Sequence, residues 1–302
     1  MTSTVFDLPL AGPAGEPVDL WRTLVSHGVA DLPPSSVDEE ARRLVTTVPL
    51  PGQKPRTLHV SEGKDGSAQV EVLGAALGRL GRERITAVLA AMLNLDEDLS
   101  GFYALAAADP ALAWATRGAG RMLRSPTVFE DVVKTICTTN CAWSATVRMV
   151  TALVDHIGEP SLRDTARAFP TPEAMARAPE SFYREVVRAG YRGSYLRALA
   201  AAVAEGSIEL ESLRAAPPEE LPDDEVAGRL LALPGVGPYA AAHIMMLLGR
   251  HSRLVLDSWT RPKWASLNGG RKANDAAIER RFRRYGRYAG LAFWLRLTQD
   301  WA

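Results

Sequence analysis

The sequence is poor in the features of secreted, membrane-bound or metal-rich proteins. Cys137 and Cys141 are its only cysteines, which excludes a four-cysteine iron–sulfur cluster and a disulfide framework. The five histidines are scattered over 302 residues without the spacing of a zinc site. The N-terminus has no basic leader before an apolar segment, and no apolar run is long enough to span a membrane. We therefore expect a cytoplasmic protein with reduced thiols and no membrane partner.

Net charge is also absent, because 35 Lys and Arg balance 35 Asp and Glu. For the whole chain this argues against a nucleic-acid partner, since phosphate contacts need clustered positive charge. The charge is nevertheless divided unevenly. Residues 250–302 hold 12 Lys and Arg against 4 Asp and Glu, and the acidic excess lies before them. The basic segment is either a nucleic-acid surface or a solvated, arginine-rich helical face.

Two regions differ in their residue patterns. Segments 41–48, 56–62 and 68–74 are short and rich in β-branched residues, and a turn at 64–66 separates the last two. After residue 78 apolar residues recur at helical spacing. We predict an α+β fold, with a small antiparallel β-rich N-terminal domain over 1–78 and an all-helical body over 79–302. Helices are expected near 82–93, 126–136, 145–158, 171–178, 181–190, 194–206, 224–233, 240–249 and 274–286, and Ser125 is expected to cap the second of them.

A Gly-x-Gly turn is the most informative motif. Gly235 and Gly237 stand in the run LPGVGPY between two apolar segments, and Pro238 suits the first position of a helix. Backbone N–H groups at the positive end of that helix would suit a DNA phosphate. The same pattern also occurs at ordinary corners between helices, so the turn alone leaves both interpretations open.

A single carboxylate follows the turn. Asp257 lies after an apolar run and before SWTRPKWA, where it can cap the next helix and stay ionised. Cleavage of an N-glycosidic bond develops positive charge on the sugar. A fixed carboxylate can stabilise that charge and orient or deprotonate the attacking water. Asp257 is therefore a candidate catalytic residue, with a plain helix cap as the alternative.

The turn and the carboxylate together resemble the helix-hairpin-helix DNA glycosylases. Residues 125–150 are similar to the segment of the 8-oxoguanine glycosylase group in which an asparagine, here Asn140, fills the gap left by the extruded base. The run RAGYRGSYL is similar to the group's wedge loop, so Tyr191 and Arg192 are expected to insert into the duplex. Without the resemblance, Tyr191 would be read as an aromatic at the edge of the core.

The resemblance runs from about Phe102 to the C-terminus, with a weaker match of the N-terminal sheet to the small β domain of this group and of the alkylbase glycosylases. It implies that Asp257 is the catalytic carboxylate and that Gly235 and Gly237 contact DNA. It also implies a monovalent cation, K⁺ or Na⁺, that orders the turn without taking part in catalysis. Backbone carbonyls would hold this cation, namely those of Leu231, Leu233 and Val236.

The departures from the group bear on the reaction. Bifunctional members carry a Schiff-base lysine where this chain has Tyr239, which cannot form an imine. The glutamine that reads 8-oxoguanine corresponds to Gly290, and the pocket cysteine corresponds to His243. Trp294 falls where the group places an aromatic ring against the flipped base. A base pocket of Tyr239, His243 and Trp294 is expected, which Trp143 and Trp259 would enlarge unless they belong to the core.

The sequence thus predicts a monofunctional DNA glycosylase that needs no cofactor for catalysis and acts as a monomer at the bacterial nucleoid. Its partner would be duplex DNA with a modified base, an alkylated purine first and an oxidised purine second. Aromatic rings suit electron-poor alkylated purines. A non-catalytic DNA-binding protein is the alternative from another class, although such a protein has no need of Asp257. A helical scaffold for proteins would leave the basic segment and the wedge residues unexplained.

Overall fold

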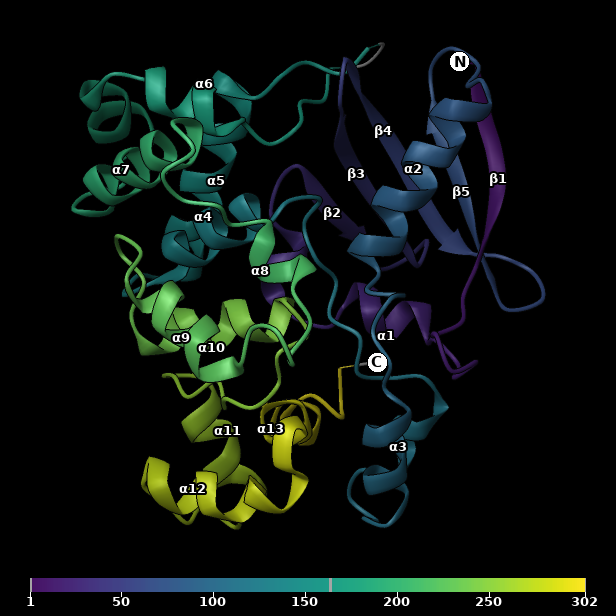
Figure 1. Ribbon diagram of the computed structural model, residues 1–302, viewed down its shortest axis with the longest axis vertical. Coiled ribbons are helices and arrows are strands. Elements are labelled where there is room, and N and C mark those ends of the chain that lie inside the picture. Colours follow the sequence, from purple (N-terminus) through teal and green to yellow (C-terminus); the bar gives the residue numbers. More distant parts are fainter. Residues whose placement is uncertain (1, 163–164, 302) are drawn as a thin grey trace.

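The computed structural model describes residues 2–162 and 165–301, and its N-terminal part is one antiparallel sheet in the order β1-β5-β4-β3-β2 (Figure 1). The strands are β1 Ser3–Pro9, β2 Ser35–Asp38, β3 Arg43–Leu50, β4 Gln53–Glu62 and β5 Ser67–Leu73. The turn between β4 and β5 lies where the sequence predicts it, with positive φ at Asp65 and Gly66. The two edge strands, β1 and β2, were not predicted, because β2 spans only four residues and β1 exposes every second residue.

Helices form the rest of the described chain, which confirms the α+β prediction. They are α1 Leu20–Leu24, α2 Arg79–Met92, α3 Ser100–Ala107, α4 Val128–Thr138, α5 Trp143–Ile157, α6 Pro172–Arg177, α7 Arg192–Ala204, α8 Ser212–Ala215, α9 Asp223–Leu231, α10 Pro238–Leu247, α11 Thr260–Leu267, α12 Asp275–Phe282 and α13 Ala289–Leu297. A π-helical turn, Phe182–Val186, replaces part of one predicted helix. Across 2–162 and 165–301 no helix is both long and apolar enough to cross a membrane.

The helix α2 packs on the sheet rather than on the other helices. Its buried residues Ile85, Leu89 and Met92 share one apolar cluster with Leu58 and Val70 of the central strands. The amphipathic spacing that predicts this helix therefore serves the core of the N-terminal part. The domain boundary after residue 78 stays a prediction.

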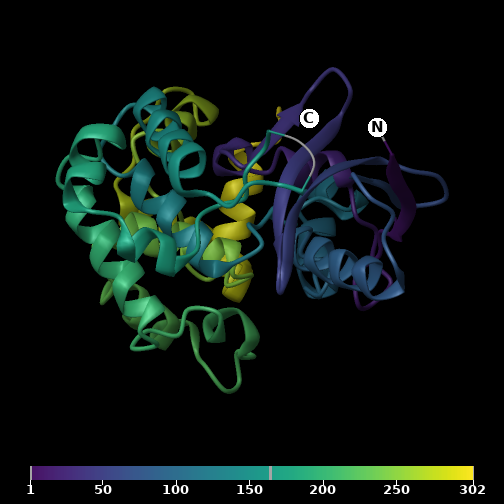
Figure 2. The same cartoon turned by 90° about the horizontal axis from the view of Figure 1, so that it is seen from above.

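The helix α10 lies between two apolar clusters of the helical part and is buried from Ala240 to Leu247. One face packs in a cluster with α4, α5, α7 and α9. The opposite face packs in a cluster with α3, α11, α12 and α13. Seen from above, the yellow helix α13 lies between the sheet and the teal and green helices α4 to α9 (Figure 2). The first turn of α10 therefore sits where both helical clusters meet.

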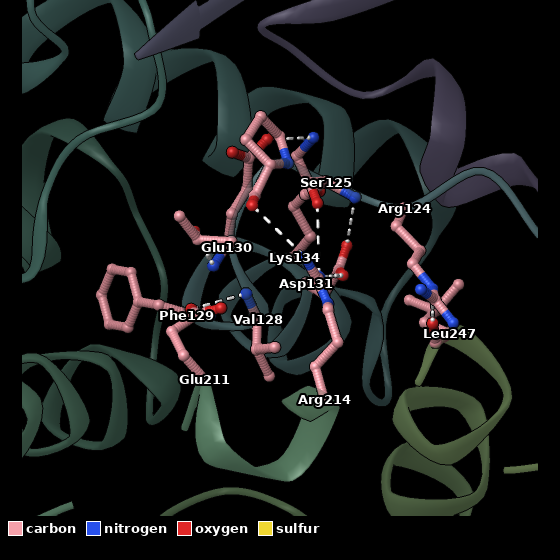
Figure 3. A network of polar contacts seen from close by, with 12 residues as sticks. Arg124, Ser125, Val128, Phe129, Glu130, Asp131, Lys134, Glu211, Arg214 and Leu247 are labelled. Carbon is pink, nitrogen blue, oxygen red and sulfur yellow. Dashed lines mark hydrogen bonds and ion pairs between the residues drawn. The ribbon is translucent and has the colours of Figure 1, made fainter. Parts of the chain in front are cut away.

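The helix α4 is buried from Val128 to Cys137, including three charged residues (Figure 3). Lys134 pairs with Glu130 at 2.7 Å, and Arg214 of α8 approaches Asp131 at 3.3 Å. Buried charges need such partners, because water cannot reach them. The network fixes α4 relative to α8 and so fixes the loop that follows α4.

The start of α4 corrects one expectation. Thr127, not Ser125, is the N-cap, and its hydroxyl accepts a hydrogen bond from the Glu130 N–H at 3.2 Å. The Ser125 N–H instead donates to Asp131 Oδ1 at 2.9 Å. Glu211 of α8 supplies a second cap, accepting from the Val128 N–H at 2.8 Å. Tertiary contacts therefore decide where this helix begins.

A second buried ion pair ties the N-terminal loop to the helical part. Arg121, which is fully buried, pairs with Glu16 at 2.8 Å and also donates to the carbonyls of Asn94 and Glu97. Glu16 in turn accepts a hydrogen bond from the Leu99 N–H. Loss of either partner would leave a charge buried without compensation.

We expect Glu16→Ala to lower the free energy of unfolding by about 3 kcal/mol, since it leaves Arg121 buried and unpaired. Glu83→Ala is the matched control, because Glu83 pairs with Arg79 on the exposed face of α2. That change should cost less than about 0.5 kcal/mol. Urea unfolding of both variants measures the difference, and equal losses would contradict the assigned role of the buried pair.

Candidate active site

The helices α9 and α10 are joined by the tight turn that the Gly-x-Gly motif predicts. Gly235 has a φ of 79°, in the left-handed region that favours glycine. A Cβ at Gly235 would also lie 2.9 Å from the ring of Tyr195. A Cβ at Gly237 would meet nothing within 4 Å. Gly235 is therefore required by the turn itself, whereas the space beside Gly237 is open to a ligand.

The N–H groups at the start of α10 are available to such a ligand. Among the described residues no acceptor bonds the N–H groups of Gly237, Tyr239 or Ala240, and no side chain caps the helix. These groups lie at the positive end of the helix dipole. The turn can therefore bind an anion such as a phosphate.

The carbonyls of the same turn are the predicted cation ligands. In the part of the chain that the structure describes, no backbone N–H donates to the carbonyl of Leu231 or Val236. The Leu233 carbonyl accepts one hydrogen bond, from the Val236 N–H at 3.2 Å. Residues 2–162 and 165–301 contain no group of three or more His, Cys, Asp or Glu that could hold a metal ion. The carbonyl oxygens thus keep lone pairs that a monovalent cation could use.

Asp257 is half-buried and is held at the beginning of α11 by one of its two carboxylate oxygens. Oδ1 accepts hydrogen bonds from the N–H groups of Trp259 at 2.8 Å and Thr260 at 2.6 Å. The Thr260 hydroxyl donates none to the carboxylate and instead accepts from the Asp257 N–H. Within the described residues Oδ2 has no hydrogen-bond donor. The carboxylate is therefore fixed in orientation and keeps one oxygen for chemistry.

Tyr239 lies close to this carboxylate and contacts both helical clusters. Burial, followed by the charge of Asp257, raises the pKa of the Tyr239 phenol, which a hydrogen bond with Thr138 partly opposes. The two hydroxyl oxygens are 3.3 Å apart. The phenol is therefore neutral, and its hydrogen bond with the end of α4 positions it.

The other two predicted pocket residues also lie together. The ring of His243 is 6.1 Å from that of Tyr239 and 6.5 Å from that of Trp294. Trp259 and Trp301 extend the cluster, with centroids 5.7 and 6.0 Å from Trp294. The structure thus brings together all three predicted pocket residues and places an aromatic wall beside them.

One residue near this wall was missed by sequence reasoning. His27, from the loop after α1, lies with its ring 5.5 Å from that of His243. Burial lowers the pKa of His27 to about 3 and that of His243 to about 4. No local signal could have found His27, because a lone histidine in a β-rich region has no spacing to another site residue.

The predicted wedge residues gather at the end of α4. Asn140 has a φ of 46°, and its side-chain amide donates to the Tyr191 hydroxyl at 3.3 Å. Tyr191 is exposed, and the bond from Asn140 lowers the pKa of its phenol. Arg192 is instead buried, and its guanidinium donates to the carbonyl and hydroxyl of Thr139. In this structure Arg192 supports the Asn140 loop, and its contact with DNA stays a prediction.

Comparisons with known proteins identify the fold. No family model and no curated protein matches the chain. The structure of MBOgg1 in complex with a low-affinity DNA ligand is similar, with a TM-score of 0.74 and 18% identity over 100% of this chain and 99% of that chain. The 3-methyladenine DNA glycosylase from Archaeoglobus fulgidus gives 0.74 and 19% over 98% of both chains.

The chain has the DNA glycosylase fold. The apo 8-oxoguanine glycosylase/lyase of Clostridium acetobutylicum also shares it, with a TM-score of 0.72 and 19% identity over 98% of this chain and 96% of that chain. In this fold the hairpin turn leads into α10, and His243 of that helix lies beside the aromatic wall.

We expect the two buried histidines to make the glycosylase fold less stable in acid. Both are neutral when folded, but in the unfolded chain they bind protons below their ordinary pKa of about 6.5. Unfolding therefore takes up protons between pH 6.5 and about 4, so the unfolding free energy falls as the pH falls through this window. The loss at pH 5 should be about 2 kcal/mol for each histidine.

Urea unfolding at pH 7 and pH 5 measures this effect. The double variant His27→Gln, His243→Gln keeps every carboxylate of the wild type, so it should lose less stability between the two pH values, by about 4 kcal/mol. An identical pH dependence of the two proteins would show that these histidines bind protons when folded.

Proposed function

We propose that this protein is a DNA glycosylase that hydrolyses the N-glycosidic bond of a damaged base in duplex DNA. The observation that carries the proposal is the position of Asp257, with Oδ1 held by two N–H groups and Oδ2 without a donor in the described chain. A protein that only bound DNA would have no use for a free carboxylate oxygen beside an anion-binding turn. The glycosylase fold and the exposed Asn140–Tyr191 pair support the same function.

In the proposed reaction the turn at Gly237 binds a backbone phosphate, and the damaged base leaves the helix stack. Water attacks C1′ of the sugar as the C1′–N bond breaks, and the bonding electron pair leaves with the base. Asp257 stabilises the positive charge that develops on the sugar and accepts the proton of the water. The exposed Tyr191 and Asn140 occupy the space that the base vacates.

The nucleophile is water rather than an amine of the protein. Tyr239 stands where bifunctional glycosylases carry a lysine and cannot form a Schiff base. Lys263 is the nearest lysine in sequence to Asp257, and its ammonium group pairs with Asp300 at 2.7 Å. This pairing directs Lys263 to a carboxylate near the C-terminus. The proposal is therefore a monofunctional enzyme.

An alkylated purine is the proposed substrate. The indoles of Trp259, Trp294 and Trp301 can stack on a cationic base. Gly290 has no room for a glutamine that would read 8-oxoguanine, because a Cβ there would lie 2.1 Å from the Arg253 carbonyl oxygen. An oxidised purine is the second candidate substrate. The ring nitrogens of His243 favour it, because they have no partner within the described chain and can form hydrogen bonds with a neutral base.

The proposed cation would be K⁺ or Na⁺ bound by the carbonyls of Leu231, Leu233 and Val236. When bound, it supplies positive charge that orders the turn and favours a nearby phosphate. The two carbonyls without a backbone donor, those of Leu231 and Val236, support this assignment. Base cleavage itself is carried out by Asp257.

We expect Asp257→Asn to slow base release by about 100-fold or more, because the transition state loses a stabilising charge. The amide oxygen can still accept the two N–H bonds, so the fold and the affinity for DNA should change little. Single-turnover excision from duplexes with single alkylated or oxidised purines measures the rate. Asp275→Asn, at an exposed carboxylate paired with Arg261, is the control. A wild-type rate in Asp257→Asn would exclude the catalytic role.

We expect borohydride to trap no covalent adduct between the wild-type protein and lesion DNA, because no amine occupies the position of Tyr239. The product should be an intact abasic strand that breaks only in hot alkali. Gel electrophoresis with and without alkali distinguishes the two products. An adduct that forms with the wild type and disappears in Lys263→Ala would make Lys263 the nucleophile and the enzyme a lyase.

A further inference from the structure

Two buried histidines from distant parts of the chain meet beside the aromatic wall. His27 comes from the loop after α1, and His243 from the helix after the hairpin turn. Their ring centroids are 5.5 Å apart and the rings are nearly perpendicular, at 84°. Less than a twentieth of each residue is exposed. The N-terminal part therefore contributes a side chain to the same place as α10.

The hydrogen bond of His27 fixes which of its nitrogens carries the proton. Nε2 lies 2.7 Å from the Leu123 carbonyl oxygen, which only accepts, so Nε2 donates. Burial keeps the ring neutral, with a pKa of about 3. Nδ1 is consequently an acceptor. It is buried and has no donor among the described residues.

His243 has even fewer partners. Neither of its ring nitrogens has a hydrogen-bond partner within the described chain, and both are buried. Burial also keeps this ring neutral, with a pKa of about 4. A neutral imidazole has one donor and one acceptor nitrogen. The pair together therefore offers a fixed acceptor on His27 and a donor and an acceptor on His243.

Hydrogen bonds hold His27 and its neighbour Ser26 in a fixed position. The Ser26 carbonyl accepts a hydrogen bond from the Trp294 indole N–H at 2.8 Å. The Ser26 hydroxyl accepts another from the Leu123 N–H at 2.9 Å. With the bond from His27 to Leu123, three hydrogen bonds fasten residues 26 and 27 to the helical part. Side chains held in this way suit the recognition of a ligand, because their geometry is set before binding.

Buried nitrogens without partners destabilise a folded protein, so three of them side by side need an explanation. A flipped base that entered beside Tyr239 and Trp294 would meet this pair. A hollow of about 330 Å³ also borders His27 and is lined by Gly28 and Trp301. Of the aromatic wall only Trp301 lines this hollow, and His243 does not line it.

We propose that His27 and His243 read the flipped base, with His27 Nδ1 accepting a hydrogen bond from an amino group or ring N–H of a damaged purine. The inference rests on the proposed function, which it deepens by naming the edge of the base that is read. His243 bonds the neighbouring polar atom of that edge, as donor or acceptor. Damaged purines without an N–H donor on this edge are poor ligands, because His27 Nδ1 stays unpaired.

The pair is closed to solvent in the DNA-free chain, so an aromatic side chain has to move when the base enters. The exposed candidates are Trp143, Trp259 and Trp301, at 48%, 38% and 38%. The indole of Trp143 lies over Gly28, 3.4 Å from the position of a Cβ there. The base therefore replaces indole contacts as it reaches the two histidines.

The test compares two free bases that differ in one amino group, 3-methyladenine and 3-methylpurine, bound to the full-length protein and followed by tryptophan fluorescence. The wild type should bind 3-methyladenine about 10- to 100-fold more tightly, as for one buried hydrogen bond. His27→Gln keeps an N–H for the Leu123 carbonyl but places no acceptor at the position of Nδ1, because its amide oxygen lies at the end of a longer side chain. His27→Asn places an oxygen near the position of Nδ1 but removes that N–H. His156→Gln, at an exposed histidine of α5, is the control.

The preference for 3-methyladenine should fall to threefold or less in His27→Gln and persist in His27→Asn and His156→Gln. A purely structural role for His27 predicts the reverse order, since only Gln keeps the bond to Leu123, and that order would overturn the proposal. Equal affinity of the wild type for the two bases would overturn it without any variant. Excision assayed on the same preparations separates the hypotheses. Base release without discrimination refutes only the histidine assignment, and no release from any lesion refutes the proposed function.

Discussion

The complete burial of α4 is the constraint on which the rest of the site depends. Because Glu130, Asp131 and Lys134 are carried inside the protein, their partners must be supplied there, by α4 itself and by α8. A shift of α4 relative to α8 would separate Asp131 from Arg214, so the helix is held in one place. Thr138 at its C-terminal end contacts Tyr239, and the charge of Asp257 raises the pKa of the Tyr239 phenol. Thr139 contacts Arg192, and Asn140 contacts Tyr191. The buried charged residues of α4 thus fix the position of the candidate active-site residues that contact the C-terminal end of this helix.

The sequence predicts the local parts of this site and not the contacts between distant parts. The turn at Gly235 and the held carboxylate of Asp257 follow from short motifs, because backbone conformation and helix capping are local properties. His27 could not be predicted, since only tertiary contacts, such as the hydrogen bond from Trp294 of α13 to the Ser26 carbonyl, bring it to α10. The inward position of Arg192 is equally a tertiary result, as two of its acceptor groups belong to Thr139 on another segment. The edge strands were missed because β2 spans only four residues and every second residue of β1 is exposed.

The charge that the surface presents also depends on contacts between distant parts of the chain, which the sequence does not predict. Counted along the chain, the last 53 residues are strongly basic, but part of that charge is neutralised in the fold by acidic residues from before residue 250. Arg250 pairs with Asp223, Arg253 pairs with Asp224, and another pair joins Arg284 to Asp109. A count along the sequence therefore overstates the positive field that DNA would meet. The backbone N–H groups at the start of α10 carry correspondingly more of the attraction for a phosphate.

The cluster of Trp259, Trp294 and Trp301 has an optical consequence. Their ring centroids lie 5.3 to 6.0 Å apart, so the three indoles absorb and emit as a coupled group rather than as separate chromophores. Such coupling gives near-ultraviolet circular dichroism that depends on the angles between the rings. A side chain that swings away by a few ångströms changes that spectrum without any label. The molecule therefore contains a built-in spectroscopic probe at the place where a base would enter.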